Sequence, residues 1–166
     1  MPYLLIAVGV IARVIPHAWN FTPISGIGLY AGAHLNPRYA WALPLIALLV
    51  GDLILGFYDL TQMVLVYVSF LAAPVVGRIL LHRRRTIPRF GAAVFSAATL
   101  HFLISNIGSW LALYPQTLDG LIQCYVLALP FYGATLLGDS IFAAIFFGCH
   151  EFVERYRRQH SNLASA

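Results

Sequence analysis

The sequence contains no lysine, and only 10% of its 166 residues are charged. The absence of lysine excludes Schiff-base chemistry, a P-loop lysine and a kinase-type phosphate clamp. There is also no glycine-rich nucleotide fingerprint, so we expect that the chain does not bind and hydrolyse ATP by itself. A soluble domain carries about 25% charged residues, far more than this chain has. The composition therefore excludes a globular fold covered by polar side chains in water.

Cysteine is scarce as well, and the common catalytic motifs are missing. Cys124 and Cys149 have the spacing of neither a disulfide framework nor a zinc site. The sequence has no His-Glu-x-x-His motif, no Gly-x-Ser-x-Gly motif and no pair of acids at a catalytic spacing. We therefore expect a protein that is not an enzyme, with no catalytic residues and no required cofactor.

Apolar residues are abundant: they make up 60% of the chain, and the mean hydropathy is +0.79. A helix that spans a membrane needs about 20 apolar residues. The apolar runs cover six segments, roughly residues 3–15, 23–34, 40–58, 61–81, 90–112 and 126–149. The sequence predicts an all-α integral membrane protein with six transmembrane helices in one compact bundle, of which helices 1 and 2 are short or broken. Residues 1–166 then form a single transmembrane domain.

The arginines predict the orientation of these segments, because basic residues near span ends stay on the cytoplasmic side. They cluster in three places: at Arg38, between Arg78 and Arg89, and between Arg155 and Arg158. These places alternate along the chain as expected for a bundle with both termini in the cytoplasm. Arg13 is the exception, since it stands at the outer end of the first segment.

Arg13 begins a polar and aromatic cluster between the first two segments. This cluster has the composition of a loop that closes over a ligand with polar and apolar parts. Its candidate binding residues are Arg13, His17, Trp19, Asn20, Phe21 and Thr22. A purely structural interpretation is a turn in which Thr22 or Asn20 caps the helix that begins at Pro23. The two roles are compatible.

Polar residues inside the spans also need a partner or a function, because each costs about 2.5–3.5 kcal/mol on insertion scales. Asp52 and Asp139 either pair helices together or contact a ligand, and His101 is either a hydrogen-bonded core residue or a metal ligand. Asn106 and Trp110 share a helix face near the outer side, where we place the pocket. The other candidates at the outer mouth are Tyr58, Tyr114 and Tyr125. A short echo, Gly51-Asp52 and Gly138-Asp139, suggests an inverted repeat.

The chain resembles a group of small bacterial membrane proteins over nearly its whole length. The most specific part of this resemblance is the Asn-Phe-Thr-Pro motif at residues 20–23. The group is similar in size and six-helix layout to the S components of energy-coupling factor (ECF) transporters. S components are membrane-embedded binders of vitamins or metal ions, and the loop between helices 1 and 2 closes their outward pocket.

The resemblance implies a substrate-binding transport protein of the bacterial inner (cytoplasmic) membrane that takes up a vitamin-type small molecule. Loop 1 and the loop at residues 114–120 would close the pocket. The first candidate substrate is cobalamin or a related corrinoid, with His17 or Cys124 as axial cobalt ligand. Many S components dock their partners through an Ala-x-x-x-Ala stripe, whereas Ala7 and Ala12 are five positions apart. The implied partners are therefore the ECF transmembrane and ATPase subunits, or none for a solitary S component; no nucleic acid is expected.

One alternative comes from the polar residues of the spans. His101 together with Asp52 or Asp139 would suit an intramembrane metal- or haem-binding enzyme, or a subunit of a respiratory complex. Haem held by two histidines requires two that face each other at one depth, and only His101 is expected near the middle of the membrane.

Overall fold

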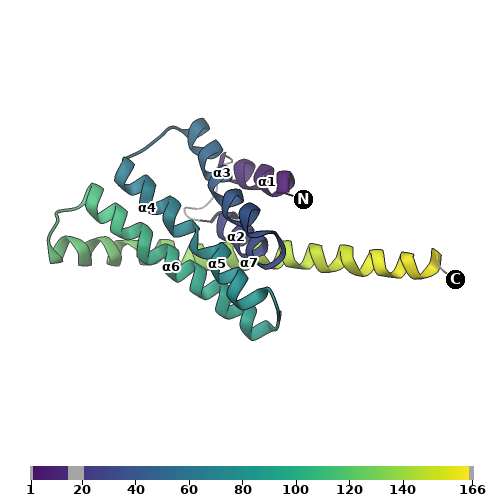
Figure 1. The fold of residues 1–166 in the computed structure, drawn as a ribbon. Coiled ribbons are helices and arrows are strands. Elements are labelled where there is room, and N and C mark those ends of the chain that lie inside the picture. Colours follow the sequence, from purple (N-terminus) through teal and green to yellow (C-terminus); the bar gives the residue numbers. More distant parts are fainter. Residues whose placement is uncertain (1, 15–20, 165–166) are drawn as a thin grey trace.

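The computed structural model describes residues 2–14 and 21–164, and every regular element in these ranges is helical (Figure 1). The elements are α1 (Pro2–Val14), α2 (Ile24–His34), α3 (Pro37–Leu55), α4 (Leu60–Phe70), α5 (Ala72–Val76), the π-helical turn η1 (Gly77–Leu81), α6 (Ile87–Leu113) and α7 (Leu118–Ala164).

Four helical stretches of the described chain are long and apolar enough to cross a membrane. They are Pro37–Leu55, Leu60–Leu81, Ile87–Leu113 and Leu118–His160. Each exceeds or approaches the ~20 residues that a 30 Å hydrocarbon core requires. The chain thus has the length and composition of a multi-pass membrane protein in a lipid bilayer.

The second of these stretches is irregular because α4, α5 and η1 follow one another along it. A turn at Leu71 separates α4 from α5. Pro74 then has no backbone N–H to donate to the preceding helical turn, and the wider turn η1 begins at Gly77. This irregular region packs against α2.

Helix α2 is the buried centre of the fold. All residues from Ile24 to Ala33 are buried, which agrees with its apolar character on every side. Glycines let the helix backbones approach: a Cβ built at Gly32 would lie 2.8 Å from the carbonyl carbon of Pro74. A Cβ built at Gly77 would lie 3.0 Å from Leu29 Cα. The backbones of α2 and the α5–η1 region are therefore in direct contact.

The ends of α3 and α4 follow ordinary capping chemistry. The Asn36 side chain accepts a hydrogen bond from the Arg38 backbone N–H at 3.1 Å, and Pro37 fills the first turn of α3. Gly56 ends α3 with a φ of +97°, a conformation that L side chains rarely adopt. Asp59 Oδ1 then caps α4 by accepting from the Gln62 backbone N–H at 3.0 Å.

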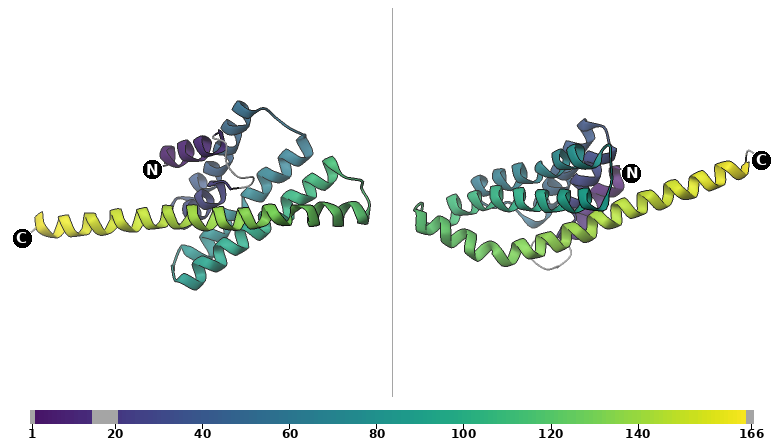
Figure 2. Two further views of the ribbon diagram at one scale, coloured as in Figure 1. Left: turned by 180° about the vertical axis from the view of Figure 1, so that it is seen from behind. Right: turned by 90° about the horizontal axis from the view of Figure 1, so that it is seen from below.

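Helix α7 is the longest element, with 47 residues. At 1.5 Å per residue it extends about 70 Å, more than twice the hydrocarbon thickness of ~30 Å. Its C-terminal part runs past the other helices in every view (Figures 1 and 2). Just beyond the last apolar turns, Glu151 lies 3.7 Å from Arg85 and 4.0 Å from Arg155. A polar helical arm therefore continues from the apolar part of α7.

Each of the six predicted segments coincides with a helix or a run of helices, and α1 and α2 are short, with 13 and 11 residues. Two predicted segments had wrong boundaries. Segment 40–58 ends at Leu55, because Gly56 leaves the helical conformation, and segment 126–149 is only the middle of α7. Thr22 does not cap α2, which begins after Pro23 without a side-chain cap; Asn20 lies outside the described residues.

Candidate functional site

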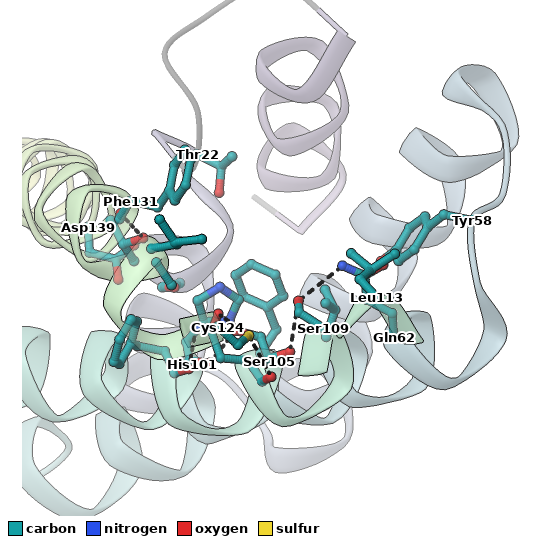
Figure 3. A pocket seen from close by; sticks show the side chains of 18 of the residues that line it. Thr22, Tyr58, Gln62, His101, Ser105, Ser109, Leu113, Cys124, Phe131 and Asp139 are labelled. Atoms are coloured by element: carbon teal, nitrogen blue, oxygen red, sulfur yellow. Dashed lines mark hydrogen bonds between the residues drawn. The ribbon is translucent and has the colours of Figure 1, made fainter. Parts of the chain in front are cut away.

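A cavity of about 710 Å³ is lined by residues of α1, α2, α3, α4, α6 and α7 and of the α1–α2, α3–α4 and α6–α7 connections. Cavities of roughly 300–1,000 Å³ hold drug-sized ligands. Figure 3 shows Asp139 near Thr22 and Phe131 on one side of the pocket, and Tyr58 with Leu113 on the other. One part of the cavity therefore reaches the helix connections, and another reaches the middle of α7.

Many residues predicted for binding line this cavity. They are Arg13, Thr22, Tyr58, Asn106, Tyr114 and Asp139, and they are joined by His101 and Cys124. Four other candidates are described but do not line it: Phe21, Asp52, Trp110 and Tyr125. The remaining candidates, His17, Trp19 and Asn20, lie outside the described residues.

Asp52 forms a buried network that joins three helices. Its carboxylate, in a residue that is 1% exposed, pairs with Arg13 at the end of α1. The Tyr67 hydroxyl of α4 donates to the other carboxylate oxygen at 2.8 Å. The Arg13 side chain lies across Gly51, where a Cβ would be 2.7 Å from Arg13 Nε. A buried ion pair needs such additional hydrogen bonds, and these contacts fit the helix-pairing interpretation of Asp52.

Tyr58 lies in the α3–α4 connection, at the mouth of the cavity. Burial raises the pKa of its phenol above the usual value, and the negative charge of Asp52 acts in the same direction, while Arg13 opposes both. The hydroxyl therefore stays protonated at neutral pH. It offers a hydrogen-bond donor where a ligand would enter.

Asp139 is the second buried acid, and its hydrogen bonding is incomplete. It is 2% exposed and accepts a hydrogen bond from the Ser25 side chain at the start of α2. Its Oδ2 is buried and has no partner among the residues that the structure describes. Buried polar groups are normally satisfied, so this oxygen needs an explanation.

The two Gly-Asp pairs of the sequence echo have similar surroundings. Arg13 lies over Gly51, and Phe21 packs on Gly138, where a Cβ would be 3.2 Å from Phe21 Cδ2. Gly51 thus contacts the end of α1, and Gly138 contacts the residue Phe21 just before α2. Asp52 contacts the flank before the α1–α2 connection, and Asp139 contacts the flank after it.

His101 is a hydrogen-bonded core residue that also lines the cavity. Its Nδ1 lies 2.8 Å from Ser69 Oγ, and the Ser69 hydroxyl donates to the Val66 carbonyl at 2.6 Å. Because that hydroxyl has one proton, we assign the Nδ1 proton to His101, which leaves Nε2 as the acceptor. The ring packs on Phe70, with the centroids 4.2 Å apart.

The enzyme alternative pairs His101 with Asp52 or Asp139. Neither pair is among the hydrogen bonds of the described residues, since Asp52 is bonded to Arg13 and Tyr67 and His101 to Ser69. Among the residues that the structure describes, no group of three or more histidine, cysteine or acidic side chains is placed to hold a metal ion.

Of the two candidates predicted on α6, Asn106 lines the cavity and Trp110 does not. Trp110 was expected at the pocket, but its Nε1 donates to the Pro115 carbonyl at 3.0 Å in the α6–α7 connection. The face that lines the cavity is instead the row Phe102, Ser105, Asn106, Ser109 and Leu113. These positions recur at i, i+3 and i+4, so they share one side of the helix.

The other two candidates on α7 contact α6. The Cys124 thiol donates to the Asn106 carbonyl at 3.5 Å, and the Tyr125 hydroxyl donates to the Leu103 carbonyl at 2.6 Å. Cys124 lines the cavity, and Tyr125 does not. Both contacts fasten the start of α7 to α6.

The sequence interpretation missed several polar residues of the cavity. Gln62 Nε2 donates to Ser109 Oγ at 3.1 Å and joins α4 to α6, and Thr135 lies one turn before Asp139 on α7. A signal for α7 exists in the sequence: the lining positions are 124, 127, 128, 131, 135 and 139. This helical spacing would have placed Asp139 and Cys124 on one face.

Comparison with known proteins gives a family. No curated protein and no solved structure matches the chain. A family described as "Family of unknown function (DUF6580)" matches residues 1–162, nearly the entire chain. The chain therefore belongs to the DUF6580 family.

Proposed function

We propose that the chain is a substrate-binding membrane protein of a transport system, similar to an S component of an ECF transporter, that takes up a vitamin-type small molecule. The observation that carries this proposal is the cavity of about 710 Å³ with its buried acid. Its walls combine many apolar side chains with a few polar groups, as binding sites for small molecules do. Apolar walls provide affinity, and the polar groups orient the ligand.

The distribution of charge supports uptake from outside. The cavity reaches the α3–α4 and α6–α7 connections, whereas Arg38, Arg78 and residues 83–85 lie at or near the α2–α3 and η1–α6 connections. Helices in series alternate direction, so these two sets of connections belong to opposite ends. Basic residues mark the cytoplasmic side of membrane proteins. In the proposed orientation the cavity opens outward and both termini are cytoplasmic.

A corrinoid is the first compound to test. The Cys124 thiol is a soft ligand in the cavity wall, and soft metals bind thiolates. The spacing of Ala7 and Ala12 favours a solitary protein over one that docks to ECF transmembrane and ATPase subunits.

The experiment is native mass spectrometry of the full chain purified in nanodiscs, which detects a co-purified small molecule. A matched pair of variants tests whether the molecule occupies the cavity. Ala128→Phe fills the lining of α7, whereas Ala144→Phe places the same side chain on an exposed position of the same helix. We expect the molecule to be lost from the first variant and retained by the second.

Two results would contradict the proposal. Either the wild-type protein carries no small molecule and binds none by calorimetry, or it carries haem with a Soret band, which supports the respiratory-complex alternative. Visible absorption after growth with cobalamin tests the corrinoid separately. A colourless protein that retains another molecule removes the corrinoid and leaves the transport proposal intact.

A further inference from the structure

The buried acid of the cavity lacks a hydrogen-bond donor. Asp139 lines the cavity, and its Oδ2 has no partner among the described residues, while Ser25 bonds to the same carboxyl group. A buried acceptor without a donor is costly to the folded protein. Because the side chain that carries this buried oxygen also lines the cavity, the missing donor is one that arrives with the ligand.

The charge balance of the lining points to the same conclusion. Arg13 and Asp139 are the charged side chains among the described lining residues, apart from the titratable His101. Arg13 is already paired with Asp52, whereas no ion pair among the described residues involves Asp139. The unbalanced group of the cavity is therefore an acid, which attracts a positive or N–H-bearing group and repels an anion.

The walls define the rest of the ligand. Phe70, Phe102 and Phe131 contribute aromatic surface from α4, α6 and α7. Figure 3 shows Phe131 close to Asp139 on the same side of the pocket. A ligand that bonds to the acid would therefore rest an apolar or aromatic body against these rings.

We propose, on the basis of the function proposed above, that the ligand presents an N–H donor group to Asp139 Oδ2 and packs an apolar or aromatic body against the phenylalanine walls. The donor is either an ammonium-type cation or a primary carboxamide. Both groups supply the missing hydrogen bond, and they differ in charge.

Three probes with the same phenylalkyl body separate these cases: 2-phenylethylamine, 3-phenylpropanamide and 3-phenylpropanoate. Their binding to the full chain in nanodiscs is measured by calorimetry. We expect the amine or the amide to bind and the carboxylate to be rejected. If the natural donor is a cation, Asp139→Asn lowers the affinity for the amine about 10- to 100-fold. If the donor is a carboxamide, the amide binds best of the three probes, and Asp139→Asn lowers its affinity by a smaller but measurable factor of about 2- to 10-fold.

A matched variant and a stability measurement control for folding. Glu154→Gln makes the corresponding change at an acid of the polar C-terminal part of α7, outside the cavity lining, and should leave probe binding unchanged. Asp139→Asn keeps an acceptor for Ser25, and the Oδ2 that it replaces bonds to nothing in the described protein. Its melting temperature should therefore match that of wild type. A much lower melting temperature would identify Asp139 as a structural acid and overturn the inference.

The remaining outcomes distinguish this inference from the proposed function. Equal binding of the carboxylate, or unchanged binding to Asp139→Asn, overturns the N–H donor, and the transport function stands. A co-purified molecule without an N–H group does the same. If no probe binds and no molecule co-purifies, both proposals fall.

Discussion

Replacing Gly32 by alanine tests whether the buried helix α2 rests directly on the backbone of α5. A Cβ at this position would lie 2.8 Å from the Pro74 carbonyl carbon and 2.9 Å from Pro74 Cα. Two carbons normally touch at about 3.5 Å, so the two helices must separate by at least roughly 0.7 Å, and the Pro74 carbonyl oxygen lies closer still to the added Cβ. All of these obstacles are backbone atoms, and a change of rotamer cannot relieve them. Such overpacking costs about 1–3 kcal/mol, which we expect as a loss in the free energy of unfolding.

Two other glycines provide controls on the same scale. A Cβ at Gly91 or Gly133 meets no atom within 4 Å, although both residues lie within helices. Alanine at either position should be neutral or stabilise the protein by up to about 1 kcal/mol, because it restricts the unfolded chain. The assay is unfolding in mixed micelles with increasing dodecyl sulfate, followed by far-UV circular dichroism.

We expect the free energy of unfolding of Gly32→Ala to be lower than that of wild type, and those of Gly91→Ala and Gly133→Ala to equal or exceed it. A Gly32→Ala variant as stable as Gly91→Ala would refute direct backbone contact between α2 and α5. The change should also weaken retention of a co-purified ligand, because α2 carries Ser25, the partner of Asp139.

Three further predictions concern charged residues. Arg13→Leu should lower the free energy of unfolding by about 3–5 kcal/mol, because it leaves the Asp52 carboxylate buried without its cation. The double change Arg13→Leu/Asp52→Leu should recover most of that loss. A double-mutant cycle in the same micelles measures the coupling energy between the two residues, and losses that simply add would refute the ion pair. Asp59→Ala removes the cap of α4 and should cost about 1 kcal/mol, seen as a lower melting temperature; an unchanged value would contradict the cap. In a cysteine-free background, Asp119→Cys should react with an impermeant maleimide on intact cells and Arg84→Cys only after permeabilisation; the reverse pattern would invert the proposed orientation.

The helices were predictable because lipid leaves few alternatives to them. A backbone in hydrocarbon must satisfy its own hydrogen bonds, so long apolar runs indicate helices whatever their neighbours are. Boundaries depended on local detail: Gly56 adopts a positive φ and ends α3 before Tyr58. At the other end of the chain, α7 continues past residue 149 because its polar turns remain helical, and an apolar pattern does not detect this.

The site was less predictable because it depends on which helices become neighbours. The sequence indicated that Asp52 and Asp139 needed partners, but spacing alone could not distinguish a structural acid from a ligand contact. In the structure the two acids differ in their contacts: Arg13 and Tyr67 bond to Asp52, whereas Oδ2 of Asp139 has no partner among the described residues. Gln62 was missed because its contact with Ser109 exists only when α4 lies against α6.

The length of helix α7 means that a small change in its direction at one point would move its far end by a larger distance. Beyond Pro130 no proline interrupts the helix up to Ala164, and Asp139 lies within this part. From Asp139 to the end of the helix there are 25 positions, or about 38 Å at 1.5 Å per residue. A change of only ~5° in the direction of the helix at Asp139 would therefore displace its far end by about 3 Å. A small change in helix direction at the acid would thus grow with distance along the helix.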